Sequence, residues 1–293
     1  MERPWHAQYD AGIPPTLSYP DVPLHRFLTD AAGRFPDRAA LEFYGRRIPY
    51  RELDELTDRF AQALIGLGVR KGDRVAIMLP NCPQALIGYF GALKAGACVV
   101  QTNPLYVGPE IAHQMADSGA ETILALDQFN PRIQEAMDRT PLKRIILTNV
   151  RDYLPWLKRL LYPIKARRQG QWVEVERVPP IYDFPALIKA APPGPPPGDV
   201  SPDDIALLQY TGGTTGVPKG AMLTHRNLVA NTIQCRWWLK GLQEGREVFL
   251  GVLPFFHVYG MTTCQTLVML LGATVVLLPR FQVDEVLKAL VAH

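Results

Sequence analysis

The sequence has 293 residues, of which 47% are hydrophobic and 20% charged, and its formal net charge is +3. A chain of this length can bury a large core, and these proportions are ordinary for a globular protein. The small net charge, without a long basic run, argues against nucleic-acid binding. The four cysteines lack C-x-x-C spacing, so we expect buried apolar residues in a reducing compartment, the cytoplasm.

Helical and strand-like patterns alternate through the first half of the chain. Apolar residues recur at spacings of three and four from Tyr50 to Leu67, which predicts a helix that Gly66 and Gly68 end. Further strands are predicted at 75–79, 98–101, 122–125 and 144–147, and helices at 83–95, from 109 to the break at 119, and across 133–137. Such alternation is typical of parallel strands joined by right-handed crossovers. The predicted fold class is α/β, with layered α/β subdomains and largely parallel sheets.

Residues 151–199 interrupt this alternation. Their last part, 190–199, is rich in proline and glycine, and we expect an extended surface connector because proline cannot donate to a strand ladder. Their first part, 151–168, holds six basic residues against one acid, interleaved with leucine and aromatic side chains. That mixture is typical of a helix on an anionic membrane surface. The alternative is a solvated helix packed on the domain.

The alternation resumes in the second half, with a strand at 205–210, a helix at 227–238 and a strand at 248–253. The run 261–278 is about long enough to cross a bilayer. Its threonines and the break at Gly272–Ala273 favour a buried helix, a turn and a buried strand instead. The final helix, 283–291, is amphipathic and lacks the strand expected after it, so we expect the sequence to be truncated.

The segment Tyr210–Gly220 carries the strongest chemical signal. It combines Lys219 with glycines at 212, 213 and 216 and threonines at 211, 214 and 215, directly after a predicted strand. Glycines let successive amides point into one concave site, and the hydroxyls and the lysine add donors and positive charge, which suits a polyphosphate. A plain surface hairpin is the alternative. The P-loop NTPase motif is excluded, since Pro218 precedes the lysine and Gly220 follows it.

This segment resembles the phosphate-loop signature of the adenylate-forming superfamily, which includes acyl-CoA synthetases, firefly luciferases and peptide-synthetase adenylation domains. Glycine at position 212, where most members have serine, is similar to the long-chain fatty-acyl-CoA ligase branch. Further motifs of the family follow in order along nearly the whole chain: Tyr50–Leu53, Gly72–Val75, Leu79–Asn81, Ala92–Ala97, Asn103–Tyr106, Leu223–Leu228 and Pro254–Gly260. The resemblance implies an N-terminal domain with helices between two sheets. One sheet unit would use about 72–197, and the other about 24–67 together with 209–293.

The implied reaction joins a fatty acid to coenzyme A at the expense of ATP. The carboxylate would attack the α-phosphorus of ATP, and coenzyme A would then displace AMP from the acyl-adenylate. By resemblance, the β- and γ-phosphates would be held by Thr211, Gly212, Gly213, Thr214, Thr215, Gly216 and Lys219. His257 lies in an aromatic cluster after a predicted strand, and by resemblance it would position the carboxylate. The alternative is that His257 only caps the edge of the core. Trp237 and Trp238 are predicted to lie on a buried helix face. The alternative is that they line an acyl tunnel.

The family's later motifs do not occur in the sequence. The Y-G-x-T-E motif, whose glutamate would hold Mg²⁺, is absent, as are the ribose-binding aspartate, the hinge and the C-terminal domain. We therefore assign no metal ligand in this chain and expect it to be inactive alone. The alternatives are another acyl or aryl adenylate-forming ligase, or a non-enzymatic module that binds nucleotide or lipid. A homodimer and a peripheral position on the inner membrane surface stay open.

Overall fold

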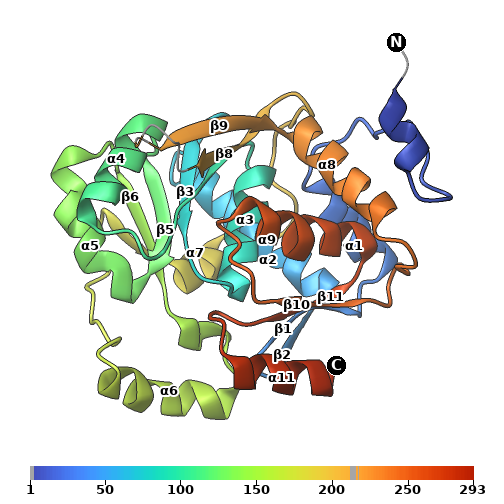
Figure 1. Ribbon diagram of the computed structural model, residues 1–293. Coiled ribbons are helices and arrows are strands. Elements are labelled where there is room, and N and C mark those ends of the chain that lie inside the picture. Colours follow the sequence, from blue (N-terminus) through green and yellow to red (C-terminus); the bar gives the residue numbers. More distant parts are fainter. Residues whose placement is uncertain (1–2, 212–215, 217) are drawn as a thin grey trace.

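The computed structural model describes residues 3–211, 216 and 218–293, and its strands form two sheets (Figure 1). The larger sheet has the order β7-β6-β5-β3-β4-β8-β9, in which only β9 runs antiparallel to its neighbour. Its strands are β3 (Arg74–Met78), β4 (Cys98–Gln101), β5 (Thr122–Leu126), β6 (Arg144–Thr148), β7 (Ile181–Asp183), β8 (Ile205–Thr211) and β9 (Lys219–Thr224).

The smaller sheet has the order β10-β11-β1-β2, with only β2 antiparallel to its neighbour. Its strands are β1 (Ala39–Phe43), β2 (Arg46–Pro49), β10 (Val248–Gly251) and β11 (Thr274–Leu277). The predicted α/β fold with largely parallel sheets is therefore confirmed. The predicted division of the chain differs from the sheets at one point. Strands β8 and β9 belong to the larger sheet, whereas the prediction put the chain from residue 209 onward with the smaller one.

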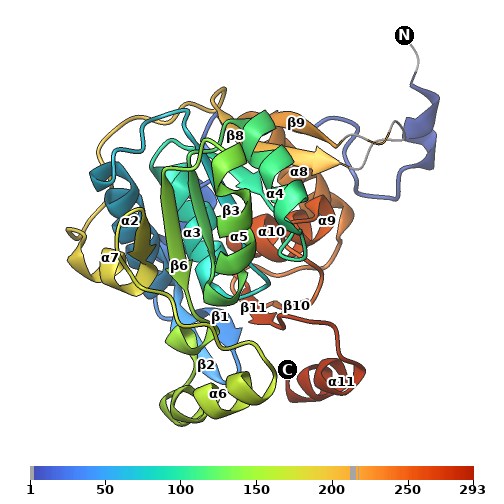
Figure 2. The same cartoon turned by 90° about the vertical axis from the view of Figure 1, so that its left-hand side faces the viewer.

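Helices cover both faces of the larger sheet. The principal ones are α1 (Arg26–Arg34), α2 (Tyr50–Gly66), α3 (Pro83–Lys94), α4 (Gly108–Ser118), α5 (Asn130–Ala136), α6 (Trp156–Arg168), α7 (Phe184–Ala190), α8 (His225–Trp238), α9 (Val258–Met261), α10 (Leu267–Leu271) and α11 (Val283–Ala292). Helix α3 packs on β3 and β4, and α2 packs on α3 and on β1 and β2, so both lie between the two sheets. Helices α4 and α5 lie on the opposite face of the larger sheet (Figure 2).

Helix α3 is buried along its whole length. Two glycines allow this close packing. A Cβ at Gly88 would lie 2.5 Å from Cδ2 of Leu124 on β5, and one at Gly91 would lie 2.8 Å from Cδ1 of Phe60 on α2. The last residue, Lys94, places its Nζ 2.6 Å from a carboxylate oxygen of Asp54 and 2.6 Å from one of Asp58, both on α2. Helix α3 is thus clamped between the larger sheet and α2 by shape and by charge.

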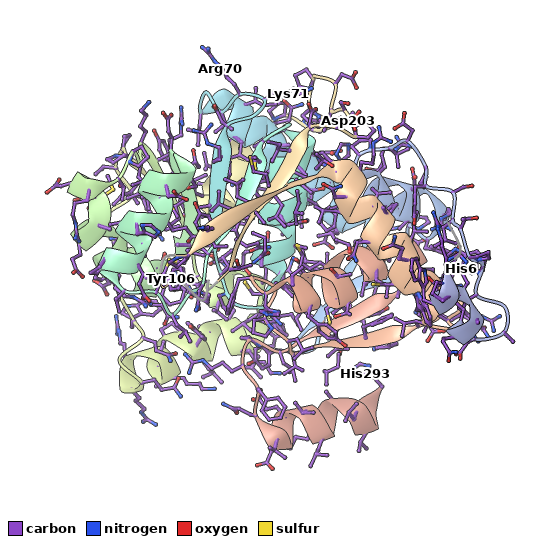
Figure 3. The ribbon with its side chains drawn as sticks, turned by 45° about the horizontal axis from the view of Figure 1, so that its top comes forward. His6, Arg70, Lys71, Tyr106, Asp203 and His293 are labelled. Atoms are coloured by element: carbon purple, nitrogen blue, oxygen red, sulfur yellow. The ribbon has the colours of Figure 1, made fainter. Side chains whose placement is uncertain are left out.

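The proline-rich connector at 190–199 contains neither helix nor strand beyond Ala190 and follows the surface, as predicted. Gln62 on α2 donates from Nε2 to the carbonyl oxygen of Pro195 at 3.0 Å. At the far end, Nζ of Lys71 donates to the carbonyl oxygen of Asp199 at 3.0 Å and pairs with Asp204. Figure 3 shows Lys71 and Asp203 at the same edge of the molecule. The connector is therefore fastened along α2 before β8 begins.

The apolar run 261–278 forms the predicted buried helix, turn and strand. The helical part passes from α9 through one π-helical segment, η5 (Thr262–Thr266), into α10, and Gly272 ends it with a φ of 61°. Strand β11 is buried at every position. In the part of the chain that the structure describes, no helix is both long and apolar enough to cross a membrane.

Candidate functional site

The candidate site lies where parallel strands of the larger sheet end. The chain passes from β3 to β4 on one side, and then from β4 to β5 on the other side of β3, so the direction of winding reverses between β3 and β4. In open α/β sheets, ligands bind outside the carboxyl ends of strands at such a reversal. Strand β8 lies next to β4, and the glycine-rich segment follows the carboxyl end of β8.

The glycine-rich segment connects β8 and β9, which form an antiparallel hairpin. Thr211 at the end of β8 and Lys219 at the start of β9 are register partners, so a hydroxyl and an ammonium group lie on neighbouring strands at the mouth of the segment. Gly216 is exposed, with a φ of 88° that favours glycine. The predicted phosphate contacts at Gly212, Gly213, Thr214 and Thr215 lie outside the described residues.

His257 caps the N-terminus of α9 and is exposed. Its Nδ1 accepts a hydrogen bond from the backbone N–H of Tyr259 at 3.3 Å, so the proton of the neutral ring lies on Nε2. Such an imidazole can donate from Nε2 to a carboxylate. Of the aromatic residues around it, Phe255 is buried and Tyr259 is 61% exposed. Phe255 therefore belongs to the core, while Tyr259 is available to a ligand.

Two amide side chains fasten the His257 segment to the larger sheet. Asn81, just after β3, donates from Nδ2 to the carbonyl oxygens of Gly251 at 2.9 Å and Leu253 at 2.8 Å, and its Oδ1 accepts the N–H of Phe255 at 3.0 Å. Gln209 on β8 donates from Nε2 to the carbonyl oxygen of Phe256 at 3.1 Å.

These bonds place the end of β8, from which the glycine-rich segment starts, beside the loop that carries His257. Leu79–Asn81 resembles a family motif, but the sequence did not predict this positioning role of Asn81. The role of Gln209 was not predicted either. The available signal was an asparagine in a short loop directly after a predicted buried strand.

The described residues do not gather a metal site. Among residues 3–211, 216 and 218–293, no three His, Cys, Asp or Glu side chains lie close enough to hold a metal ion. A Mg²⁺ ion accompanying a nucleotide would take most of its ligands from phosphate oxygens and water. Among the described residues, the candidate site would draw on the cation of Lys219, the hydroxyl of Thr211 and the imidazole of His257.

His225 serves the fold rather than the candidate site. It begins α8 and is 1% exposed, and its Nδ1 accepts the N–H of Leu24 at 3.1 Å. Thr224 is the N-cap of this helix, since its hydroxyl accepts the N–H of Asn227 at 3.2 Å. The prediction for Trp237 and Trp238 was wrong, because both lie in the last turn of α8 with about half of their surface exposed, at 45% and 49%.

We expect the fold to lose stability in acid because His25 and His225 both have lowered pKa values. Burial is the main cause that lowers the pKa of His225 to about 4 and that of His25 to about 3. The unfolded chain takes up these protons first, so the stability that the two neutral rings contribute is present above pH 6.5 and is lost as the pH falls from about 6.5 to about 3. We expect His225 alone to account for a fall of about 2 kcal/mol in the free energy of unfolding between pH 7 and pH 5.

Urea unfolding of the wild type and of His225→Asn at both pH values measures this contribution. Asparagine keeps an acceptor for the N–H of Leu24 but does not titrate. The variant should lose less stability than the wild type on acidification. Parallel losses in the two proteins would show that His225 is not the group responsible.

A glycine- and threonine-rich segment that follows the carboxyl end of a strand, next to the reversal point of an α/β sheet, is typical of nucleotide-binding proteins. The family model for "AMP-binding enzyme" matches residues 28–293. The chain therefore belongs to the AMP-binding enzyme family, within the adenylate-forming superfamily.

Curated relatives share this region. The chain is 42% identical to a long-chain-fatty-acid–CoA ligase of Bacillus subtilis (strain 168), over 100% of this chain and 52% of that protein. It is 35% identical to a ligase of the same name from Escherichia coli O157:H7, over 89% of this chain and 47% of that protein. The chain thus spans about half the length of the curated relatives it matches.

Solved structures show the same fold. A long-chain-fatty-acid–CoA ligase from Archaeoglobus fulgidus superposes with a TM-score of 0.79 at 25% identity, over 97% of this chain and 52% of that one. The inhibitor-bound N-terminal domain of FACL13 from Mycobacterium tuberculosis superposes with a TM-score of 0.70 at 25% identity, over 92% of this chain and 60% of that one.

Proposed function

We propose that this chain supplies the phosphate-binding loop and part of the acyl site of an ATP-dependent, AMP-forming long-chain fatty-acid–CoA ligase. The family match and the names of its curated relatives support the reaction class. Glycine at position 212 supports the long-chain branch. The observation that carries the proposal is the fastening of the His257 segment beside the end of β8 by Asn81 and Gln209.

The proposed reaction has two steps. A carboxylate oxygen of the fatty acid bonds to the α-phosphorus of ATP, and the bond to pyrophosphate breaks. The thiolate of coenzyme A then bonds to the acyl carbon, and AMP leaves. Both steps depend on stabilising developing negative charge and on holding the reacting groups in place. Mg²⁺ would enter with ATP and neutralise part of the phosphate charge.

Three described residues have roles in the first step. The ammonium of Lys219 and the hydroxyl of Thr211 would lie against the β- and γ-phosphates and stabilise the departing pyrophosphate. The Nε2 proton of His257 would hold the attacking carboxylate. His257 lies on the loop after β10, and Thr211 lies at the end of β8. Because Gln209 bonds these two segments together, the carboxylate and the phosphates would meet between them.

Calorimetric titration of the 293-residue chain with ATP and with AMP tests the proposal. Lys219 and Thr211 are assigned to the β- and γ-phosphates, so ATP should bind more tightly than AMP. The variant Lys219→Ala should weaken ATP binding by about tenfold or more, as expected for a lost charge-assisted hydrogen bond, while AMP binding should change little. The control Lys240→Ala removes an exposed lysine that pairs with Asp10 and should leave both affinities unchanged. Equal binding of ATP and AMP, or an equal response of the two variants, would contradict the proposal.

A further inference from the structure

A cavity of about 720 Å³ is lined by residues of α2, α6 and α7, far from the candidate site. The segment η4 (Val150–Tyr153) follows β6, and α7 follows β7, so the cavity lies at the carboxyl ends of these two strands. Three strands of the larger sheet separate β6 from β8, which puts the cavity about 20 Å from the end of β8. Figure 2 shows α7 beside α2, with α6 below them. The volume is in the range of small-molecule sites.

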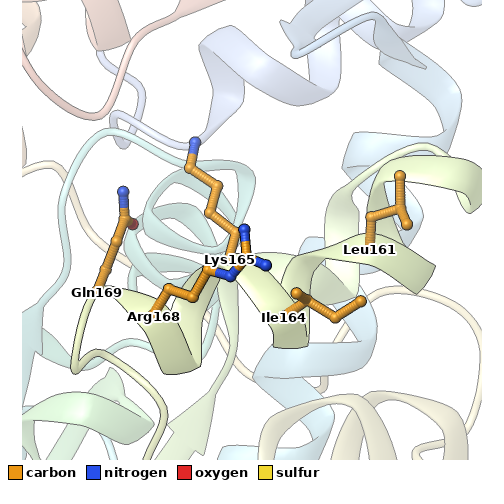
Figure 4. Close-up of a pocket in the computed structure, with 5 residues that line it drawn as sticks. All are labelled: Leu161, Ile164, Lys165, Arg168 and Gln169. Atoms are coloured by element: carbon orange, nitrogen blue, oxygen red, sulfur yellow. The ribbon is translucent and has the colours of Figure 1, made fainter.

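Basic side chains from five separate elements line this cavity. They are Arg46 of β2, Arg59 of α2, Arg151 of η4, Arg159 of α6 and Lys189 of α7. A smaller hollow, of about 300 Å³, is lined only by side chains between residues 161 and 169, from one helix and its C-cap (Figure 4). Cations that the fold brings together from five elements repel one another unless acids or a bound anion offset them. The larger cavity is therefore the one that raises the question of a ligand.

The three carboxylates of the cavity are already bonded within the protein. Glu55 pairs with Arg59 at 2.9 Å. Asp152 accepts a hydroxyl and a backbone N–H at the start of η4, at 3.0 and 2.8 Å. Asp183 caps α7 and pairs with Arg177 at 3.3 Å. Only one of the five cations of the cavity is thus paired with an acid of the cavity itself.

Three of the cations have no ionic partner. Arg151, Arg159 and Lys189 form no ion pair with any residue that the structure describes, whereas the other two cations each pair with a glutamate. The Nε atom of Arg151 is buried, and no described residue accepts its hydrogen bond. Its guanidinium group lies 5.1 Å from the centre of the Trp172 ring, which holds the group without neutralising it. An anion in the cavity would supply the missing acceptor.

The lining favours an organic phosphate over other anions. Guanidinium groups bind two phosphate oxygens at once, and a phosphate monoester carries a charge of about −1.5 to −2 at pH 7, which suits three uncompensated cations better than one carboxylate does. Leu56 and Ile188 give the cavity an apolar part. A bare phosphate ion would leave that part in contact with water.

We propose that this cavity binds a small, soluble organic phosphate ester. The phosphate lies against Arg151, Arg159 and Lys189, and the organic group lies against Leu56 and Ile188. The proposal is independent of the proposed function, because no residue of the cavity belongs to the candidate site.

Calorimetric titration of the 293-residue chain at constant ionic strength tests this proposal with three probes: phenyl phosphate, inorganic phosphate and succinate. Burying the phenyl ring against the apolar part should make phenyl phosphate bind about tenfold more tightly than inorganic phosphate. Succinate, which spreads its two charges over two groups, should bind more weakly than phenyl phosphate. Absence of saturable binding of phenyl phosphate, or tighter binding of succinate, would overturn the proposal.

Matched variants locate the bound phosphate. Arg151→Gln and the double variant Arg159→Gln/Lys189→Gln should each weaken phenyl phosphate binding by about tenfold or more, as expected for lost hydrogen bonds to a charged group. The control Arg139→Gln, at an exposed arginine outside the cavity, should change it little. Equal responses of the cavity and control variants would contradict the proposal.

Two further measurements keep the result specific. Arg159 and Lys189 are exposed, so their double variant should unfold on heating as the wild type does, and its result stands even where Arg151→Gln is less stable. Lys219→Ala removes the cation of the candidate site and should weaken phenyl phosphate binding far less than the cavity variants do. A larger loss in Lys219→Ala would place the probe at the glycine-rich segment and contradict a separate phosphate site.

Discussion

Replacing Lys94 with alanine is expected to lower the free energy of unfolding by about 3–5 kcal/mol, the range for removing one partner of a buried ion pair. The lysine side chain is 4% exposed and bridges Asp54 and Asp58, which are also largely buried. Without it, two carboxylates of α2 face each other and the end of α3. Burial, its largest cause, already raises the pKa of Asp58, and Lys94 is the main group that opposes this shift. Removing Lys94 would raise that pKa further.

Urea unfolding at pH 7 measures this loss. The matched control is Lys143→Ala, which removes an equally short ion pair, to Glu121, at an exposed site. Exposed pairs contribute about 0–1 kcal/mol, so the control should unfold almost as the wild type does. Comparable losses in the two variants would contradict the view that the Ala92–Ala97 motif carries a buried ion cluster that clamps α3 to α2.

Replacing Asn81 with alanine is expected to lower the free energy of unfolding by about 3 kcal/mol and to loosen the His257 segment. Asn81 is 3% exposed and makes three hydrogen bonds, one to the last residue of β10 and two to the loop after it. Its loss leaves the N–H of Phe255 and the carbonyl oxygens of Gly251 and Leu253 without this partner, and a buried polar group left unpaired costs about 1–3 kcal/mol. Because the loop continues directly into the cap of α9, the imidazole of His257 would lose its fixed position.

Amide hydrogen exchange separates this positioning role from a general loss of stability. In Asn81→Ala, the amide of Phe255 should exchange at least about tenfold faster, while the amides of β5 and β6 should be protected as in the wild type under strongly native conditions. Asn81→Asp keeps the acceptor for Phe255 and should preserve more of the protection. Asn103→Ala, at a residue whose Oδ1 accepts only the N–H of Leu105 in an exposed turn, is the control. Uniform acceleration across the whole chain would argue against a specific role.

Periodicity predicted most of the regular structure between residues 50 and 147. The helix from Tyr50 and the strand at Cys98–Gln101 begin where predicted, because apolar spacing and glycine or proline at the ends act locally. The hairpin strands were missed. Strand β2 carries Arg46 and Arg47, and β9 has no buried residue, so neither shows an apolar run. Their pairing partners, rather than their own side chains, make them strands.

The site was predicted only in its parts. The glycine-rich segment and His257 stood out because their residue types carry chemistry by themselves. The bond from Asn81 to Gly251 joins positions 170 residues apart, and no local pattern reports such a contact. The exposed positions of Trp237 and Trp238 show the same limit. Aromatic character favours burial, yet both residues lie in the exposed last turn of α8, where the Trp238 ring lies 5.1 Å from that of Tyr9.

A crystal structure of this chain grown with ATP tests the central claim most directly. We expect the triphosphate to lie between Thr211 and Lys219, with backbone amides of the intervening segment directed at the phosphate oxygens and with His257 at the edge of the same site. A structure with those amides bonded to the protein itself, and with ATP bound elsewhere, would contradict the account.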